Sequence, residues 1–332
     1  MPALRSVPPS AIALSCFTVE TQSVSLITPV LRSGFLYLSN QGWLRRWMET
    51  SSTSQKFTSR FVAGLSLEDG LRVCVLLQAQ GVLSSLDHLG ENVHELAEAD
   101  AARRSYLAAL ERIATAGLPT TVSMKLTALG LDLSEETARQ NAAALVGKAR
   151  DIGTRIEMDM ESTRYTDRTL LILREMHAEG GPVRAVIQAY LHRSADDIDQ
   201  LCRDGIPVRL CKGAYKEPPD IAYANKRDVD LNYVRLMKKL LDDGTYPAIA
   251  SHDEAILDEA MRYVREKKYS KDRFEFQMLY GIRRALQARI VKEGFRLRVY
   301  VPYGAAWYPY FMRRLAERPA NALFLIRNLF RA

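Results

Sequence analysis

Two adjacent arginines near the end of the chain, Arg313 and Arg314, have the chemistry to hold a carboxylate. They follow Tyr310 by three and four residues, the spacing that places side chains on one face of a helix. A guanidinium can grip a carboxylate through two parallel hydrogen bonds, so this pair favours an anionic ligand. An amphipathic surface helix with two solvated arginines is the alternative that this stretch leaves open.

A strand pattern comes directly before this helix. In residues 296–301, three apolar residues alternate with Arg296, Arg298 and Tyr300, which is the period of a β-strand. A proline and a glycine then end the pattern. The sequence therefore predicts that Tyr300 lies at a strand end, while Tyr310 and the arginine pair belong to the helix that follows.

The composition is that of an ordinary globular protein with a modest positive charge. The chain has 332 residues and a formal net charge of +7, and eight of its basic residues lie from Lys292 onward. This excess suits an anionic substrate, an acidic partner or an anionic membrane surface. It is too small to indicate nucleic acid, and no basic motif with interleaved aromatic residues accompanies it.

Cysteine and histidine patterns argue against disulfide and metal chemistry. The four cysteines are scattered without a C-x-x-C pair, which indicates a reducing compartment, and the five histidines form no metal motif. No metal is expected. No apolar run reaches the length that spans a membrane. We expect a cytoplasmic protein, either free or bound peripherally to the inner face of the membrane.

The rhythm of the chain changes near residue 80. Residues 1–35 are rich in Ser, Thr and Val, and 36–80 have a helical pattern, so 1–80 are predicted to form an N-terminal extension with helices. Residues 81–332 are predicted to form one catalytic barrel. Eight strand patterns occur there, at 81–87, 120–126, 155–160, 183–189, 208–212, 246–251, 273–278 and 296–301. A helical pattern follows each, at 92–116, 135–151, 166–178, 195–203, 228–241, 253–266, 282–292 and 306–331.

Eightfold strand–helix alternation predicts an α/β fold of the TIM-like (β/α)8 barrel type. A doubly wound open sheet is the alternative. The strands are unusual for a barrel because charged residues such as Glu157, Arg209 and Glu275 alternate with apolar ones. Buried charges must be paired or must surround a polar ligand. Half-exposed antiparallel strands would also alternate, but the intervening helices argue against them.

In a barrel, the residues at the carboxyl ends of the strands form the site. Here they are Asp87, Lys125, Asp159, Gln188, Lys212, Ser251, His252, Leu279 and Tyr300. The loop after the fifth strand pattern contains Gly213, which suits close backbone approach to a phosphate or an aromatic ring. Lys125 or Lys212 at a strand end is also compatible with a Schiff-base aldolase or lyase, although that chemistry leaves the arginine pair unexplained.

The chain resembles the proline dehydrogenase family, most closely its monofunctional bacterial form. The resemblance is carried by VRLCKGAYKEP at 208–218 and VYVPYGAAWYPYFMRRLAERPAN at 299–321, together with LDHLGEN at 86–92, MDMEST at 158–163 and other stretches in the family order. It covers about residues 80–330. It implies a distorted (β/α)8 barrel, FAD as cofactor, and oxidation of L-proline to Δ1-pyrroline-5-carboxylate by hydride transfer, the first step of proline catabolism to glutamate.

The resemblance also implies roles for individual residues. The proline carboxylate would be held by three cations, Lys125, Arg313 and Arg314. The pyrrolidine ring would be enclosed by Tyr215, Leu279, Tyr300 and Tyr310. Two residues would act near the reaction: Asp159, which orients an arginine, and Arg209, which lies near flavin N5. The rest of the FAD site would be lined by Met160, Gln188, Cys211, Lys212, Gly213, Ser251 and His252.

The implied partners follow from the same resemblance. Electrons would pass from the flavin to quinone, so peripheral contact with a membrane surface is expected. The product would be oxidised by a separate pyrroline-5-carboxylate dehydrogenase. No nucleic-acid partner is expected.

Overall fold

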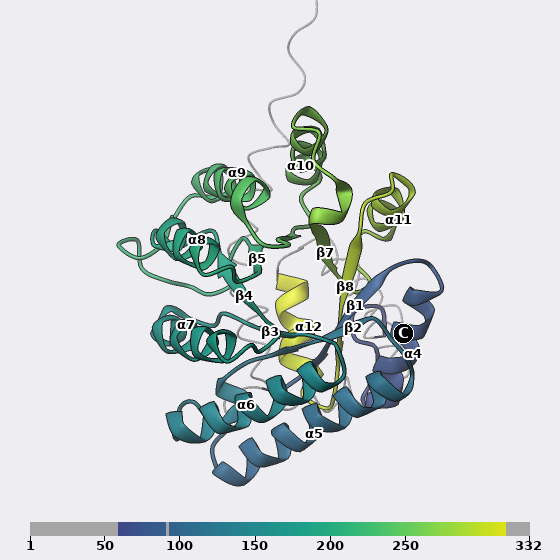
Figure 1. Ribbon diagram of the computed structural model, residues 1–332, viewed down its shortest axis with the longest axis vertical. Helices are drawn as coiled ribbons and strands as arrows, with labels where there is room; N and C mark the ends of the chain where they lie inside the picture. Colours follow the sequence, from purple (N-terminus) through teal and green to yellow (C-terminus); the bar gives the residue numbers. More distant parts are fainter. Residues whose placement is uncertain (1–58, 91–92, 317–332) are drawn as a thin grey trace, which may run out of the picture. The chain divides into compact units, whose positions relative to one another are not determined.

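Eight parallel strands close into a barrel (Figure 1). The computed structural model describes residues 59–90 and 93–316. The strands are β1 Leu83–His88, β2 Thr120–Met124, β3 Ile156–Met158, β4 Val183–Gln188, β5 Val208–Cys211, β6 Ala248–Ala250, β7 Glu275–Leu279 and β8 Leu297–Tyr303. Each pairs with the next, and β8 pairs with β1. The predicted barrel is confirmed, and the open sheet is excluded.

Helices follow the strands in turn and surround the barrel (Figure 1). They are α5 Leu96–Thr115, α6 Glu135–Asp151, α7 Thr163–Ala178, α8 Ser194–Arg203, α9 Lys226–Asp243, α10 Glu254–Glu266 and α11 Arg284–Lys292. Helix α4, Leu67–Gln78, precedes β1, and α12, Trp307–Ala316, follows β8. Two short 3-10 helices lie at Thr127–Leu129 and Lys271–Arg273. The predictions for residues 1–58 and 317–331 lie outside the described residues.

Side-chain caps explain where several helices begin. Ser66 accepts a hydrogen bond from the Asp69 N–H, and the Asp69 side chain accepts one from the Ser66 N–H, which forms a capping box at the start of α4. The Ser134 side chain caps α6 by accepting a hydrogen bond from the Thr137 N–H. Asp253 caps α10 through the Ala255 N–H. Each of these caps is formed by residues within three positions of one another, so each is a property of the local sequence.

The chain forms two compact units. Residues 52–307 form the unit that contains the barrel, and residues 1–51 and 308–332 form the other. Helix α4 packs against β1 and β8 inside the barrel unit. The predicted boundary between an extension at 1–80 and a barrel at 81–332 stays a prediction.

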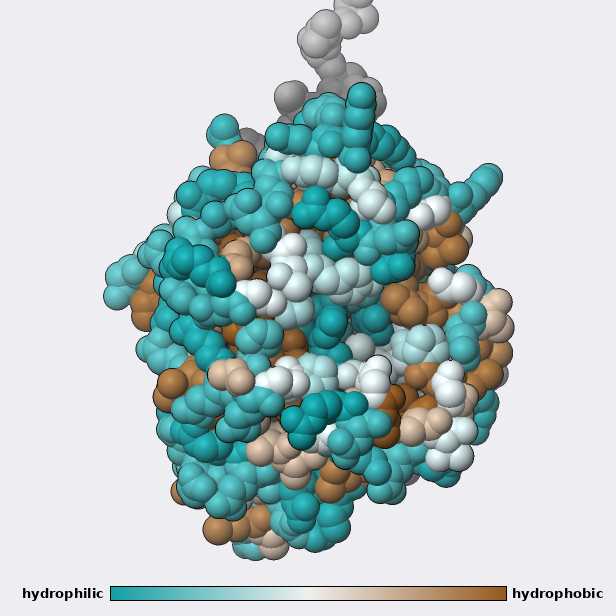
Figure 2. Space-filling model, viewed as in Figure 1, coloured by the Kyte–Doolittle hydropathy of each residue, from teal (hydrophilic) through white to brown (hydrophobic). Residues whose placement is uncertain are grey.

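Polar side chains fill the barrel interior, while apolar side chains pack between the strands and the helices. Glu157, Arg184 and Glu275 are fully buried. So are Phe276, on the other face of β7, and Phe274, which directly precedes that strand. The strands are parallel and buried on both faces, which excludes the half-exposed antiparallel alternative. Figure 2 shows that the surface over the outer helices is mostly hydrophilic, as expected for the solvent side of such a barrel.

Candidate active site

A layer of paired charges crosses the barrel interior. Arg184 Nη1 donates to Glu157 Oε1 at 3.1 Å and to Glu275 Oε1 at 2.7 Å. Arg298 donates to both oxygens of Glu275, at 2.8 and 3.1 Å. Arg209 Nη1 donates to Glu157 Oε2 at 2.9 Å. Three guanidinium groups thus share two buried carboxylates, so most of the interior charge is already neutralised before any ligand binds.

The charge layer keeps its acids ionised. Burial by itself raises the pKa of a carboxyl group, but the pKa of Glu157 is held below its ordinary value by Arg184, Arg209 and Arg298. The pKa of Glu275 is likewise lowered, mainly by Arg298 and Arg184, against the effect of burial. The layer therefore acts as a fixed platform under the carboxyl ends of the strands.

Above this layer, Arg209 of β5 connects to Asp159 after β3 and Tyr300 of β8. Arg209 Nη2 donates to Asp159 Oδ1, and the Tyr300 hydroxyl donates to Asp159 Oδ2 at 3.2 Å. The Arg209 guanidinium carbon lies 5.5 Å from the centre of the Tyr300 ring. Residues from β5, β8 and the end of β3, which are far apart in sequence, are joined here, and Asp159 is in a position to orient Arg209.

The electrostatics of this cluster are set by burial and by opposite charges. Burial raises the pKa of Asp159 above its ordinary value, although Arg209 and Lys125 act in the opposite direction. Burial would lower the pKa of Arg209, but Asp159 and Glu157 raise it above the ordinary arginine value. Arg209 is therefore a permanent cation. The charge of Lys125, half-buried after β2, also reaches Asp159.

Asp87, at the end of β1, is a buried carboxyl group that the sequence placed at a strand end without giving it a role. Its side chain is 1% exposed, and neither oxygen has a hydrogen-bond partner within the described part of the chain. Two residues earlier, Ser85 hydrogen-bonds Ser123 inside the barrel at 3.0 Å, so Asp87 faces the interior as well. Its charge also raises the pKa of Asp159. A ligand that brings a donor would satisfy Asp87.

The loop after β5 is shaped by one lysine and one glycine. Lys212 Nζ forms ion pairs with Asp230 of α9 and, at 2.9 Å, with Asp253 at the start of α10. Gly213 has φ +129°, and a Cβ there would lie 2.2 Å from the Tyr190 ring. Only glycine fits this position. Sequence reasoning did not find these partners of Lys212, because both lie far from it along the chain.

Gln188, at the end of β4, ties together the loops on either side. Its Nε2 donates to the Glu161 carbonyl at 2.9 Å and to the Met160 carbonyl at 3.4 Å. Its Oε1 accepts from the Ala214 N–H at 3.0 Å. Met160 and Gln188 are both buried. The amide is therefore fixed in orientation, and it holds the loops after β3 and β5 next to each other.

The ends of β6 and β7 are joined through a histidine. His252 Nε2 accepts a hydrogen bond from the Leu279 N–H at 2.8 Å, so a neutral ring carries its proton on Nδ1. Ser251 Oγ accepts from the Asp253 N–H at 3.0 Å.

On β5, burial raises the pKa of Cys211 to about 12. Cys211 is therefore a neutral thiol at pH 7 and a poor nucleophile.

For the remaining predicted site residues, the structure gives fewer contacts. Tyr215 is half-buried in the loop after β5. Tyr310 and Arg314 lie on α12 in the other unit, with the Arg314 guanidinium carbon 5.2 Å from the centre of the Tyr310 ring. The side chain of Arg313 lies outside the described residues. The predicted carboxylate grip by the arginine pair therefore stays a prediction.

Two further features concern metals and membranes. In the described ranges, no group of three or more histidine, cysteine or acidic side chains is arranged to hold a metal ion. Among the helices of the same ranges, none combines the length and apolar character needed to cross a bilayer.

A closed parallel barrel whose carboxyl end gathers Asp87, Lys125, Asp159, Arg209 and Tyr300 defines a (β/α)8-barrel enzyme. The family model described as proline dehydrogenase matches residues 71–327, and the chain belongs to that family. It is an oxidoreductase that oxidises proline, the first step of proline catabolism.

Individual relatives agree with this assignment. "Proline dehydrogenase 1" of Bacillus subtilis (strain 168) is 40% identical over 303 residues, which cover 91% of this chain and 100% of the relative. "Proline dehydrogenase" of Deinococcus radiodurans is 40% identical over 277 residues, 82% of this chain and 89% of the relative. A solved structure of proline utilization A from Bdellovibrio bacteriovorus, inactivated by N-propargylglycine, has a TM-score of 0.76 and 25% identity. The match covers 88% of this chain but 37% of that longer protein.

Proposed function

We propose that this enzyme oxidises L-proline to Δ1-pyrroline-5-carboxylate with FAD, at the carboxyl end of the barrel. The observation that carries the proposal is the Arg209–Asp159–Tyr300 cluster, which places a permanent cation and an aromatic ring over a buried charge layer. Such a site suits an amino acid whose charges need fixed partners. The lysine-based aldolase is not favoured, because Lys212 is engaged by Asp230 and Asp253 and the family is that of proline dehydrogenases.

The donors at the barrel mouth fit a flavin. A flavin ring presents carbonyl oxygens and ring nitrogens along one edge, and these need hydrogen-bond donors. Arg209 brings a cationic donor. Lys212 has three ammonium protons, of which the ion pairs with Asp230 and Asp253 use two. Gly213 leaves its backbone open to close approach. We assign the remaining positions of the FAD site to Met160, Gln188, Cys211, Ser251 and His252. FAD, when bound, supplies the acceptor for the hydride from the proline carbon beside the amine.

The residues of the chain bind and orient the substrate. Lys125, at the end of β2, would pair with the proline carboxylate. The resemblance adds Arg313 and Arg314 to this role, and that assignment rests on the sequence alone. Tyr300 and Leu279 would contact the pyrrolidine ring, with Tyr215 and Tyr310 also taken from the resemblance.

We assign the substrate amine to Asp87. When the C–H bond breaks and the C=N bond forms, the ring nitrogen gives up a proton. Both oxygens of Asp159 are engaged by Arg209 and Tyr300, whereas those of Asp87 have no hydrogen-bond partner within the described part. Asp87 would therefore accept the ring N–H and hold the amine in place.

The finer partners come from the resemblance. Quinone would take the electrons from the reduced flavin at a membrane surface, and a separate dehydrogenase would oxidise the product. The protein would then act in the cytoplasm or at the inner face of the membrane.

The first experiment is the visible spectrum of the purified protein before and after anaerobic addition of L-proline. A flavin spectrum that bleaches with L-proline is expected. A flavin spectrum that L-proline does not change would show that L-proline is not the substrate. A colourless protein that cannot be reconstituted with FAD would show that FAD is not the cofactor.

A further inference from the structure

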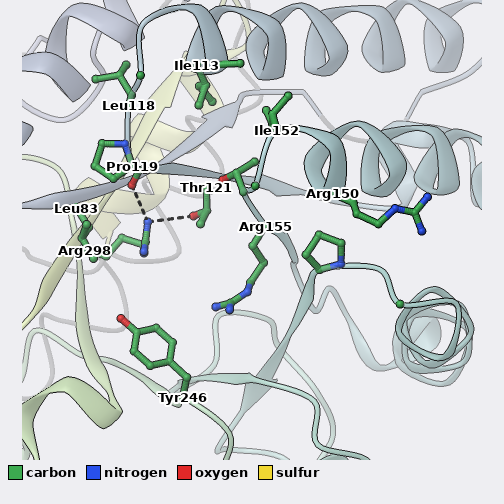
Figure 3. A pocket seen from close by; sticks show the side chains of 16 residues that line it. Leu83, Ile113, Leu118, Pro119, Thr121, Arg150, Ile152, Arg155, Tyr246 and Arg298 are labelled. Carbon is green, nitrogen blue, oxygen red and sulfur yellow. Dashed lines mark hydrogen bonds between the residues drawn. The ribbon is translucent and has the colours of Figure 1, made fainter.

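A pocket lies at the amino end of the barrel strands (Figure 3). The proposed active site is at the opposite, carboxyl end. The walls of the pocket come from the segments that enter the first four strands, including Leu83, Leu118, Thr154 and Pro182. The cavity has a volume of about 640 Å³, within the range of small-molecule sites. The amino end of a barrel normally contributes stability alone, so a pocket of this size there calls for an explanation.

The charge of this pocket is one-sided. Among the residues that the structure describes, three arginines line it, Arg150, Arg155 and Arg298, and no acidic residue does. Arg298 is already engaged, by both oxygens of Glu275 and by the Ser84 carbonyl at 2.7 Å. Arg150 is exposed, and Figure 3 shows that it points away from the other labelled side chains. Of the described lining residues, Arg155 is therefore the cation that remains for a ligand.

Arg155 is half-buried, and among the described residues its guanidinium meets the Tyr246 ring and forms no hydrogen bond or ion pair. It extends toward Tyr246 in Figure 3, with its guanidinium carbon 5.8 Å from the centre of the ring. Burial, followed by the neighbouring Arg184, lowers the pKa of Arg155 from its ordinary value, although the buried carboxylates Glu157 and Glu275 act in the opposite direction. An anion beside it would supply the partner that the protein does not.

Tyr246 forms the opposite side of the pocket in a backbone conformation that bulky residues rarely adopt. Its φ is +44°, in the left-handed region. The ring lies 5.4 Å from the Arg184 guanidinium, and the hydroxyl donates to Glu275 Oε2 at 3.0 Å. Strained residues of this kind gather where a protein holds a ligand or a fixed site. Tyr246 is thus held rigidly beside Arg155.

The other walls are apolar, formed by residues such as Leu83, Ile113, Leu118 and Ile152. One cation beside apolar walls recognises a single negative charge on an apolar body, whereas a phosphate dianion would call for more cations. We propose that this pocket binds a small organic carboxylate, with Arg155 holding the carboxylate and the apolar walls holding the body. The proposal is independent of the assignment of the active site at the other end.

The test uses the full-length, flavin-loaded protein and 4-(trifluoromethyl)benzoate as the probe, followed by fluorine NMR line broadening. Saturable binding is expected. Arg155→Met should weaken it about tenfold or more, because a charge-assisted hydrogen bond is lost. Ala114→Trp should weaken it similarly, because Ala114 lines the pocket from an exposed position on α5 and the indole fills the space without removing a cation.

Arg103→Met is the matched control for the loss of an arginine. Arg103 lies on α5, as Ala114 does, but it pairs with Asp100 outside the pocket. The affinity of the Arg103→Met protein for the probe should stay within about twofold of that of the parent protein, because surface ion pairs contribute little. Absence of saturable binding to the parent protein overturns the proposal. An unchanged affinity for the probe in Arg155→Met or in Ala114→Trp also overturns the proposal. That outcome includes the case in which the probe binds only at the active site. If Arg155→Met does not fold, Ala114→Trp decides.

Discussion

At the scale of single residues, two buried carboxyl groups in the active site have different roles. Asp159 is engaged by Arg209 and Tyr300, whereas Asp87 has no hydrogen-bond partner in the described part of the chain. The first is placed to orient a cation, and the second is placed to receive a donor from the substrate. Substitution of each should therefore have a different signature.

Asp159→Asn should leave the flavin bound but lower kcat/KM for proline about 10- to 100-fold. The reason is that Arg209 loses a charged partner that fixes its position, which is worth roughly 1.5–3 kcal/mol. Steady-state kinetics together with flavin content per chain check this. Asp196→Asn, an exposed position on α8, is the control and should behave like the parent. Equal kcat/KM in both variants would contradict the role of Asp159.

Asp87→Asn should make the protein without substrate more stable and yet bind proline less well. A buried carboxyl group without partners opposes folding, and its replacement by an amide is expected to raise the free energy of unfolding by about 1–2 kcal/mol. The Michaelis constant for proline should rise, because the amine loses its acceptor. Urea denaturation and kinetics measure the two effects. A less stable variant with an unchanged Michaelis constant would refute both parts.

At the scale of elements, the loop after β5 and the ends of β4 and β6 are locked by a few contacts that only certain residues permit. Gln188 bridges the loops after β3 and β5, and Lys212 is held by the starts of α9 and α10. Gly213 lies between these anchors against Tyr190. The backbone there is shaped by its surroundings as much as by its own sequence.

Gly213→Ala should displace this loop and reduce the amount of flavin that copurifies with the protein. The added methyl group would meet the Tyr190 ring at 2.2 Å, and the φ of +129° is unfavourable for alanine. Absorbance at the flavin maximum per chain is the measurement. Gly147→Ala is the matched control, because it lies in α6 with open space around it, and it should stabilise the protein by about 0.5–1 kcal/mol. Full flavin content in Gly213→Ala would count against the proposed FAD site.

At the scale of the whole barrel, the buried charge layer links β3, β4, β5, β7 and β8. Its carboxyl groups have lowered pKa values in the folded protein, so they bind protons more weakly than in the unfolded chain. Their contribution to stability is fully present above the ordinary glutamate pKa of 4.5 and is lost as the pH falls below it. The layer thus makes the fold sensitive to acid.

Glu275→Gln should remove much of this acid sensitivity while destabilising the protein at pH 7. Arg184 and Arg298 would lose a shared buried partner, which costs about 3–5 kcal/mol. The free energy of unfolding, measured from pH 7 to pH 3, should therefore be lower at pH 7 and fall less steeply. Glu136→Gln, on the exposed face of α6, should keep the parent profile. A Glu275→Gln profile parallel to that of the parent would show that the layer does not set the acid limit.

The sequence by itself determined the barrel and the family. Eight strand–helix repeats and the bounds of α6 could be predicted, because periodicity is a property of neighbouring residues. The resemblance added the family and the positions at the strand ends. It also named Asp159 as the residue that orients an arginine, and Arg209 as a residue near the flavin.

Tertiary structure alone decided which of these residues meet. Arg209 and Asp159 are 50 residues apart, Arg184 and Glu275 are 91 apart, and no local pattern predicts such pairs. The isolation of Asp87 and the pocket around Arg155 also depend on the closure of the barrel, which brings segments from several strands to one place. Pairing inside a closed sheet is set by register and burial across the whole fold, and a single chain segment carries neither.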